Sequence, residues 1–138
     1  MEEGVESVSA TLKEILAGYP EIRLGILYGS VAAGTARPDS DVDVAVAKHH
    51  RHPLDDETLI DISLSCSRRL GREVQVRDLS RAGGVFLKEV LTKGTVVYQT
   101  DTVTRAELII RMLDFVEDML PTVRMIRRKN RERFLAGE

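Results

Sequence analysis

The 138-residue sequence contains one cysteine, no tryptophan, three tyrosines and three phenylalanines. Because Cys66 has no second cysteine to pair with, an internal disulfide is excluded, and the composition suits a reducing cytoplasm. No apolar run reaches the roughly 18 residues that a membrane helix needs, and the N-terminal stretch MEEGVESVSA is acidic and polar. We therefore expect a cytoplasmic protein with no membrane span and no signal peptide.

Charge is unevenly distributed along the chain. The whole sequence has a net charge of −2, whereas residues 124–133 carry six basic side chains and one acidic one, so the remainder sums to −7. This basic end fits a helix terminus that faces water, and it equally fits contact with RNA or with an acidic protein. Phe134 alone is a poor platform for stacking single-stranded nucleic acid. Direct nucleic-acid binding therefore stays open.

The order of the expected elements is typical of a mixed α/β fold. Hydrophobic periodicity predicts strands over residues 22–28, 41–47, 73–79 and 95–98, and helices over residues 5–16, 53–70, 81–93 and from 104 onward. Ser80 is expected to cap the third helix, and Thr104 with Glu107 to form a capping box for the last. Pro121 is expected to kink that last helix. We divide the chain into a domain of residues 1–100 and an amphipathic helical extension of residues 101–138 with a basic end.

Small residues follow the first predicted strand directly. Gly29 and Ser30 come immediately after residues 22–28, and a helix that opens there has free N–H groups in its first turn. Such groups, together with the Ser30 hydroxyl, can hold a phosphate, and Gly29 allows the backbone to approach it closely. Taken alone, the pattern also fits an ordinary turn between a strand and a helix.

Two acids alternate with valines at the start of the second predicted strand. Asp41 and Asp43 are two residues apart, so their carboxylates project from the same face. Neighbouring ionised carboxylates repel one another, and a divalent cation removes that conflict. Mg²⁺ prefers one or two carboxylates together with phosphate oxygens. The alternative is a solvated edge strand with two exposed acids.

Taken together, the two patterns resemble a known signature. Gly29-Ser30, ten intervening residues and Asp41-x-Asp43 are similar to the motif of the minimal nucleotidyltransferases, or MNT domains, of the DNA polymerase β superfamily. The resemblance implies a small mixed sheet flanked by helices and the transfer of a nucleoside monophosphate from ATP to a hydroxyl. It also implies that Gly29 and Ser30 hold the triphosphate and that Asp41 and Asp43 bind two Mg²⁺ ions. Arg37 and Ser40 lie in the intervening loop and are expected to contact the nucleotide, although Arg37 fits equally well as a solvated loop residue.

The third predicted strand departs from the family pattern. The family places a third carboxylate where this chain has Gln75, and a neutral amide is a poorer ligand for a hard cation. In two-metal transfer that acid serves the ion next to the acceptor, so its absence is expected to slow transfer more than it weakens nucleotide binding. Glu73 lies on the same face about 6.6 Å away along the strand and could substitute, whereas Asp78 points to the other face.

The chain is too short to contain a dedicated acceptor-binding domain, so we expect the acceptor to arrive on another macromolecule. Its size resembles that of the MntA-type antitoxins, which are paired with a HEPN-domain ribonuclease toxin. The resemblance implies transfer of AMP from Mg-ATP to a tyrosine of that toxin, which silences it. Two alternatives remain. One is a catalytically impaired antitoxin that acts by stoichiometric binding, and the other is a nucleotidyltransferase that acts on RNA or a small molecule.

Three histidines, His49, His50 and His52, occupy the loop after the second predicted strand. Their spacing could bind a metal ion, but no cysteine lies nearby in the sequence. We therefore expect an ordinary surface loop at this position.

Overall fold

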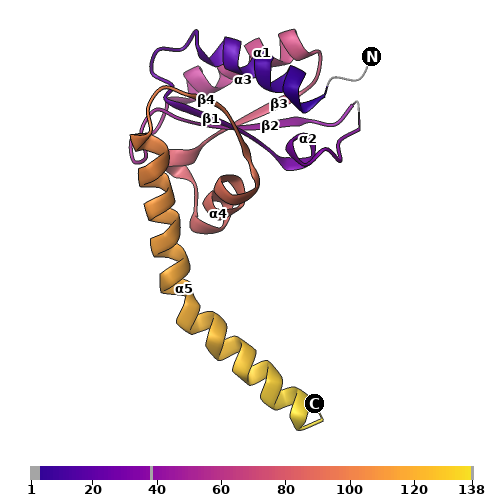
Figure 1. The fold of residues 1–138 in the computed structure, drawn as a ribbon, viewed down its shortest axis with the longest axis vertical. Helices are drawn as coiled ribbons and strands as arrows, with labels where there is room; N and C mark the ends of the chain where they lie inside the picture. The colour runs from indigo at the N-terminus through magenta and orange to yellow at the C-terminus, as the bar shows by residue number, and fades with distance from the viewer. Residues whose placement is uncertain (1–3, 38, 138) are drawn as a thin grey trace.

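In the computed structural model, which describes residues 4–37 and 39–137, a four-stranded mixed sheet lies between two layers of helices (Figure 1). The elements follow in the order α1 (Val5–Leu16), β1 (Leu24–Tyr28), α2 (Gly29–Ala33), β2 (Val42–Ala47), α3 (Asp56–Leu70), β3 (Val74–Asp78), the 3-10 helix η1 (Leu79–Arg81), α4 (Gly84–Lys93), β4 (Thr95–Gln99) and α5 (Val103–Leu135). The strand order is β3-β2-β1-β4. Since β2 runs antiparallel to β1 and parallel to β3, the predicted mixed sheet is confirmed.

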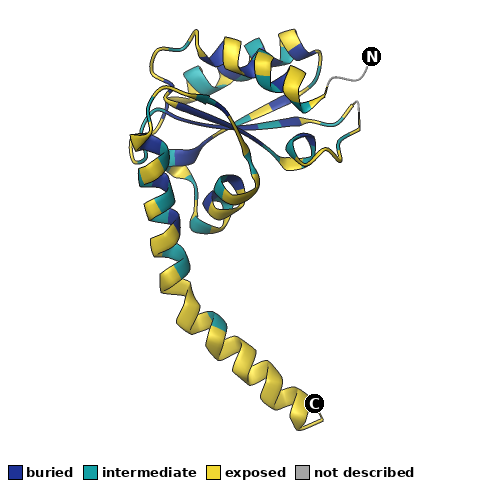
Figure 2. Cartoon of the chain, in the orientation of Figure 1, coloured by how far each residue is buried: buried dark blue, intermediate teal, exposed yellow. Residues whose placement is uncertain are grey.

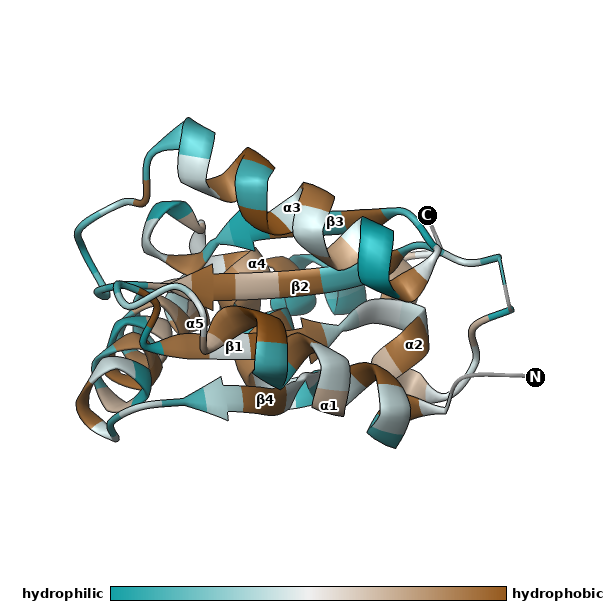
Figure 3. Ribbon diagram, turned by 90° about the horizontal axis from the view of Figure 1, so that it is seen from above, coloured by the Kyte–Doolittle hydropathy of each residue, from teal (hydrophilic) through white to brown (hydrophobic). Residues whose placement is uncertain are grey.

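The alternation of side chains along β2 divides the core into two parts. Val42, Val44 and Val46 pack with α1 and α3 on one face of the sheet. Ala45 and Ala47 pack with α4 and the first turns of α5 on the other. Figure 3 shows β2 hydrophilic at its start, beside α2, and hydrophobic along the rest of its length. The start of β2 is therefore the part of this central strand that is available for polar chemistry.

The start of α4 differs from the sequence prediction. We expected a helix over residues 81–93 capped by Ser80, whereas the chain forms η1 first and α4 begins at Gly84. The cause is Asp78, whose Oδ1 accepts hydrogen bonds from the N–H and the hydroxyl of Ser80, at 2.9 and 2.8 Å. Ser80 donates its hydroxyl to Asp78, so the predicted cap is wrong.

The start of α5 is also capped differently from the prediction. No side-chain hydrogen bond comes from the N-cap residue, Thr102. Instead Asp101 Oδ1 accepts from the N–H groups of Val103 and Thr104, both at 3.1 Å. The predicted capping box is wrong, because α5 begins at Val103, so Thr104 lies inside the first turn and donates its own N–H to Asp101.

The two ends of α5 have different surroundings. Leu108 and Met112 are buried against the sheet, so the first turns of the helix belong to the core. Residues 117–135, which we call the outer segment, are all exposed except for the half-buried Val123. This segment extends away from the sheet (Figures 1 and 2). The division into residues 1–100 and 101–138 stays a prediction.

Pro121 lies inside α5 without ending it. Because proline has no N–H, the carbonyl of Glu117 loses its intrahelical donor, and α5 curves along its length in Figure 1.

Within the described part of the chain, no helix combines the length and the apolar character that a membrane crossing requires.

Candidate nucleotide-binding site

Gly29 and Asp43 form the centre of the candidate site. The antiparallel register places Tyr28, the last residue of β1, opposite Asp43 on β2. The next residue, Gly29, begins α2 with φ of +78°, in the left-handed region that favours glycine. A Cβ atom at Gly29 would lie 2.5 Å from Oδ2 of Asp43. Glycine is therefore required twice, for its backbone angle and for the close approach of the carboxylate.

The turn after Gly29 is short and closed at both ends. Helix α2 spans five residues and ends at Gly34, whose φ is +74°. The carbonyl of Ser30 accepts a hydrogen bond from the N–H of Thr35 at 3.0 Å, which folds the chain back after one turn. The N–H groups of its first turn have no intrahelical acceptors, so they are available to an anion. Ser30 follows Gly29 directly in this first turn and is half-buried.

The two predicted metal-binding carboxylates differ in exposure. Asp41 is exposed just before β2, whereas Asp43 is half-buried within it. Burial raises the pKa of Asp43, the charge of Asp41 raises it further, and Arg77 opposes both effects. A divalent cation between the two carboxylates would relieve the desolvation and the repulsion together, so this donor set fits Mg²⁺.

The position of the third acid is occupied by an amide. The parallel register of β2 and β3 places Gln75 directly opposite Asp43. Glu73 precedes β3 and is exposed, and its carbonyl accepts the N–H of Val42 at 2.9 Å. Asp78 is buried, and its Oδ2 accepts the N–H of Leu54 at 2.7 Å, so this carboxylate holds a loop in place. Whether Gln75 or Glu73 ligates a metal ion stays a prediction.

Arg37 and Ser40 lie at the two ends of a tight turn between α2 and β2. The N–H of Arg37 donates to the Ser40 hydroxyl at 2.8 Å, and the N–H of Ser40 donates to the Arg37 carbonyl at 3.0 Å. Arg72, just before β3, donates two hydrogen bonds to the Ser40 carbonyl, at 2.6 and 3.0 Å. The Arg37 side chain itself is exposed. The sequence patterns missed Arg72, which anchors this loop to the sheet, and the nucleotide contacts of Arg37 and Ser40 stay predictions.

An aromatic and cationic cluster that the sequence patterns also missed lies on the same face of the sheet. Arg77 is two residues beyond Gln75 on β3, and its guanidinium carbon lies 5.1 Å from the centre of the Phe86 ring. Phe86 in turn meets Tyr28 edge to face, with ring centres 5.3 Å apart. Burial and Asp43 raise the pKa of the Tyr28 hydroxyl, and Arg77 lowers it. The site therefore has one fixed positive charge beside its carboxylates.

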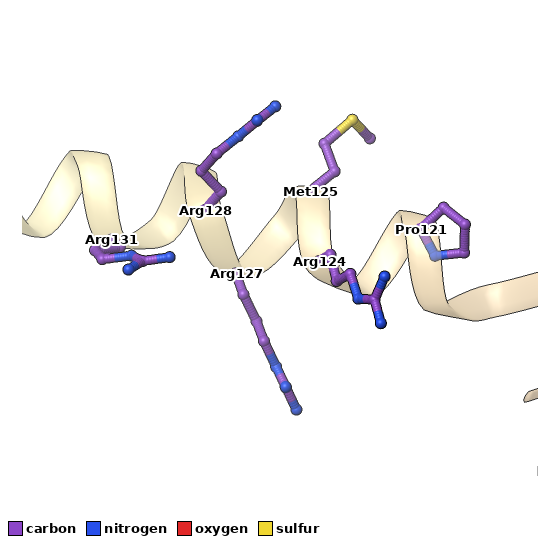
Figure 4. A pocket seen from close by; sticks show the side chains of 6 residues that line it. All are labelled: Pro121, Arg124, Met125, Arg127, Arg128 and Arg131. Atoms are coloured by element: carbon purple, nitrogen blue, oxygen red, sulfur yellow. The ribbon is translucent and has the colours of Figure 1, made fainter. Parts of the chain in front are cut away.

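The basic outer segment of α5 lies far from these residues along the chain and forms a separate surface. Figure 4 shows the side chains around Pro121 and Met125, with Arg127 and Arg128 pointing to opposite sides of the helix. Arg124 and Arg131 project from the same stretch. Exposed apolar side chains accompany them, including Met119, Leu120, Met125, Ile126, Phe134 and Leu135. Such a mixture of exposed apolar and basic groups is typical of a surface that binds another macromolecule.

Comparison with known proteins places this site in context. The model of the polymerase beta nucleotidyltransferase family matches residues 10–103. The protein adenylyltransferase MntA of Shewanella oneidensis is 28% identical over 89 residues, which are 64% of this chain and 63% of that protein. The match thus spans less than two thirds of the length of that relative.

Solved structures share the fold at lower identity. A chain from a toxin–antitoxin complex with AMP-PNP superposes with a TM-score of 0.72 at 21% identity, over 88% of this chain and 96% of that one. A chain from the complex of the tri-AMPylated HEPN toxin of Shewanella oneidensis with its MNT antitoxin gives a TM-score of 0.64 at 19% identity, over 89% and 98% of the two chains. Both alignments cover most of the two chains, so the likeness extends to the whole fold.

Proposed function

The chain belongs to the polymerase beta nucleotidyltransferase family. On this basis we propose that it transfers AMP from Mg-ATP to the hydroxyl of a tyrosine in a HEPN-domain toxin. The observation that carries this proposal is the approach of the Gly29 backbone to Asp43, because a turn suited to phosphate then lies beside a carboxylate suited to a metal ion. The similarity to an adenylyltransferase and to chains of toxin–antitoxin complexes supports the choice of substrate and acceptor.

The residues have separate roles in this reaction. The N–H groups of the first turn of α2 and the Ser30 hydroxyl bind the phosphates. Asp41 and Asp43 hold Mg²⁺, which when bound neutralises charge on the phosphate oxygens and orients them. The acceptor oxygen forms a bond to the α-phosphorus as its proton passes to solvent water, the bond from that phosphorus to the bridging oxygen breaks, and pyrophosphate leaves. Arg77 adds positive charge on the same face, where negative charge accumulates.

Gln75 limits the rate of this reaction in our proposal. The Gln75 amide cannot accept the acceptor's proton, and it is a weak ligand for a second Mg²⁺ ion. Glu73, two residues earlier and exposed, would replace it only in a different register, because the observed pairing places Gln75 and not Glu73 opposite Asp43. ATP binding depends on Ser30, Asp41 and Asp43 and should be nearly normal, while transfer should be slow.

The outer segment of α5 is the part of the chain that we assign to binding the toxin. Its arginines favour an acidic surface, and its exposed apolar side chains would be buried in the contact. Because the segment extends away from the sheet that carries the candidate site, we expect that docking and chemistry can be separated by mutation.

A second candidate function follows from Gln75. If the amide opposite Asp43 abolishes transfer, the protein would silence its partner by stoichiometric binding and would keep the nucleotide site without using it for chemistry. This binding function requires the same outer segment but no release of pyrophosphate.

A labelling experiment tests the proposed activity. The protein is incubated with ATP labelled at the α-phosphate, Mg²⁺ and the product of its neighbouring gene. We expect label on that partner, lost when Mg²⁺ is chelated, when the acceptor tyrosine is changed to phenylalanine, or when Asp41→Asn is combined with Asp43→Asn. Silencing of the partner with no label on it would favour stoichiometric binding, and label on RNA would identify a different acceptor class.

A further inference from the structure

A second cluster of metal-binding side chains lies at the other end of β2. The strand begins beside Asp41 and Asp43 and ends at Ala47, and the loop that follows contains three histidines. The six residue-to-residue steps from Asp43 to His49 span about 20 Å when extended. The histidines are therefore remote from the nucleotide site, and a metal bound there serves a different purpose.

The fold adds to this loop a ligand that the sequence spacing does not reveal. One ligand atom from each of His49, His50 and Glu107 lies within 4.8 Å of the others, and all three residues are half-buried. Glu107 is on α5, more than fifty positions further along the chain. Oε2 of Glu107 lies against Nδ1 of His50. The imidazole of His50 and the carboxylate of Glu107 therefore already face one another, although they come from a loop and a helix that are distant in the sequence.

The cluster is held together by an arginine one turn further along α5. The Arg111 guanidinium donates to the carbonyl of His50 at 2.6 Å, and also to the carbonyls of Leu79 at 2.8 Å and Ala82 at 3.1 Å. These bonds fix the backbone of the histidine loop against the helix that carries Glu107. The ligands are thus positioned by the fold before any ion arrives, which reduces the entropy cost of binding.

The donor set selects the kind of metal. Two imidazoles and one carboxylate match the nitrogen and oxygen ligands of Zn²⁺, and three protein ligands leave a fourth position for water. Mg²⁺ prefers oxygen ligands in octahedral geometry, so this set disfavours it. His49 Nδ1 accepts a hydrogen bond from the N–H of Arg51 at 3.1 Å, and binding of an ion would open that bond. Arg51 is exposed, so water can take over its N–H.

We propose that His49, His50 and Glu107 form a Zn²⁺ site that ties the loop after β2 to the first turns of α5. An ion there would add a cross-link between the sheet and the helix whose outer segment projects from the body. His52 stacks on His49 with ring centres 4.3 Å apart but lies outside the ligand group. This site is independent of AMP transfer, so it stands or falls separately from the proposed function.

The test uses the full chain with Asp41→Asn and Asp43→Asn, so that the nucleotide site takes up no metal. After removal of bound metal, the protein is titrated calorimetrically with Zn²⁺ and, in parallel, with Mg²⁺. We expect one Zn²⁺ per chain, no comparable uptake of Mg²⁺, and a Tm that rises with Zn²⁺ because the ion binds the folded state.

Single substitutions in the same background assign the ligands. His49→Gln and Glu107→Gln should each weaken Zn²⁺ binding by at least about 10-fold. Loss of a residue that only supports a metal ligand already lowers metal affinity by about that factor, and loss of a ligand itself should cost no less. His52→Gln is the matched histidine control and should leave the affinity unchanged. Tm without metal identifies any variant that fails to fold, and His49→Gln, which removes no ion pair, then decides the result. Absence of Zn²⁺ uptake by the parent, or equal losses from His49→Gln and His52→Gln, would overturn the proposal.

Discussion

The nucleotide site and the outer segment of α5 are built in opposite ways. At the site, Gly29 has a positive φ and no room for a Cβ, and the loop that leads to Asp41 is held by Arg72. In the outer segment almost every side chain is exposed and only Val123 is half-buried. Chemistry needs groups held in a fixed geometry, whereas a docking surface needs groups left free for a partner. This difference fits the proposal that AMP transfer takes place at the first region and partner binding at the second.

The largest expected effect concerns the completeness of the nucleotide site. Gln75→Asp restores a carboxylate opposite Asp43, and single-turnover transfer at saturating Mg-ATP should rise by on the order of 10²–10⁴. Partner binding through the outer segment should not change. Glu73→Gln is the matched control and should have little effect on the parent. A fast parent that Glu73→Gln inactivates would show that Glu73 is the third acid.

A smaller effect is expected when the close approach at the site is blocked. Gly29→Ala places a Cβ 2.5 Å from Asp43 Oδ2 and forces alanine to a φ of +78°. Strain of this kind costs on the order of 1–3 kcal/mol, so unfolding in urea should begin at lower concentration and Mg-ATP should bind more weakly. Gly34→Ala, at a φ of +74° but in open space, separates the two causes. If both variants bind Mg-ATP alike, the contact with Asp43 has no role in binding.

Removing most of the outer segment tests whether this region binds the partner. Deletion of residues 121–138 should weaken partner binding by at least about 10-fold, or 1.4 kcal/mol, and leave ATP binding intact. The buried residues of α5, Leu108 and Met112, remain in the shortened chain. Charge reversal at Arg124 and Arg128 in the full chain distinguishes the effect of the arginine charges from the effect of shortening the helix. Undiminished partner binding at physiological salt would contradict the assignment of this surface.

The smallest effect concerns the anchor of α5. Asp101→Ala removes the acceptor for the N–H groups of Val103 and Thr104 and should cost about 1 kcal/mol of stability at neutral pH. Asp101→Asn keeps an acceptor and should lose less. Those same N–H groups lower the pKa of Asp101, with help from Arg23, so the ionised carboxylate stabilises the fold above its unfolded pKa of about 3.9.

The pH dependence follows from that sign. As pH falls through the lowered pKa of Asp101, the carboxylate becomes protonated and its advantage over alanine should disappear. Urea unfolding of both proteins between neutral pH and pH 3 measures this difference. A gap between the two proteins that stays constant over this range would mean that the charge of Asp101 contributes nothing.

Short-range patterns predicted most of the fold, while the roles of the candidate site residues stay predictions. The alternation of Asp41 and Asp43 with valines marked β2, and the small residues after Tyr28 marked the turn that opens α2. Both features depend on neighbours in the chain, so the printed sequence contains them. The predicted caps failed where two side chains competed for the same groups, as when Asp78 took the Ser80 hydroxyl.

Contacts between distant segments could not be read in this way. The stacking of Arg77 on Phe86 and the meeting of His50 with Glu107 arise only when β3, α4, α5 and the loop after β2 pack together. Nothing in the spacing of these residues distinguishes them from ordinary surface positions. These contacts become visible only in the folded chain. The cluster of His49, His50 and Glu107 changes the interpretation of the histidine loop from an ordinary surface loop to a proposed metal site.

The central claim is that Gly29, Ser30, Asp41 and Asp43 form one Mg-ATP site, and calorimetric titration tests it most directly. ATP is titrated into the parent with Mg²⁺, into the parent with chelator, and into the variant that combines Asp41→Asn with Asp43→Asn. We predict Mg²⁺-dependent binding to the parent and none to the variant, while circular dichroism confirms that the variant keeps its fold. Equal Mg-ATP affinity in the parent and the folded double variant would contradict the account.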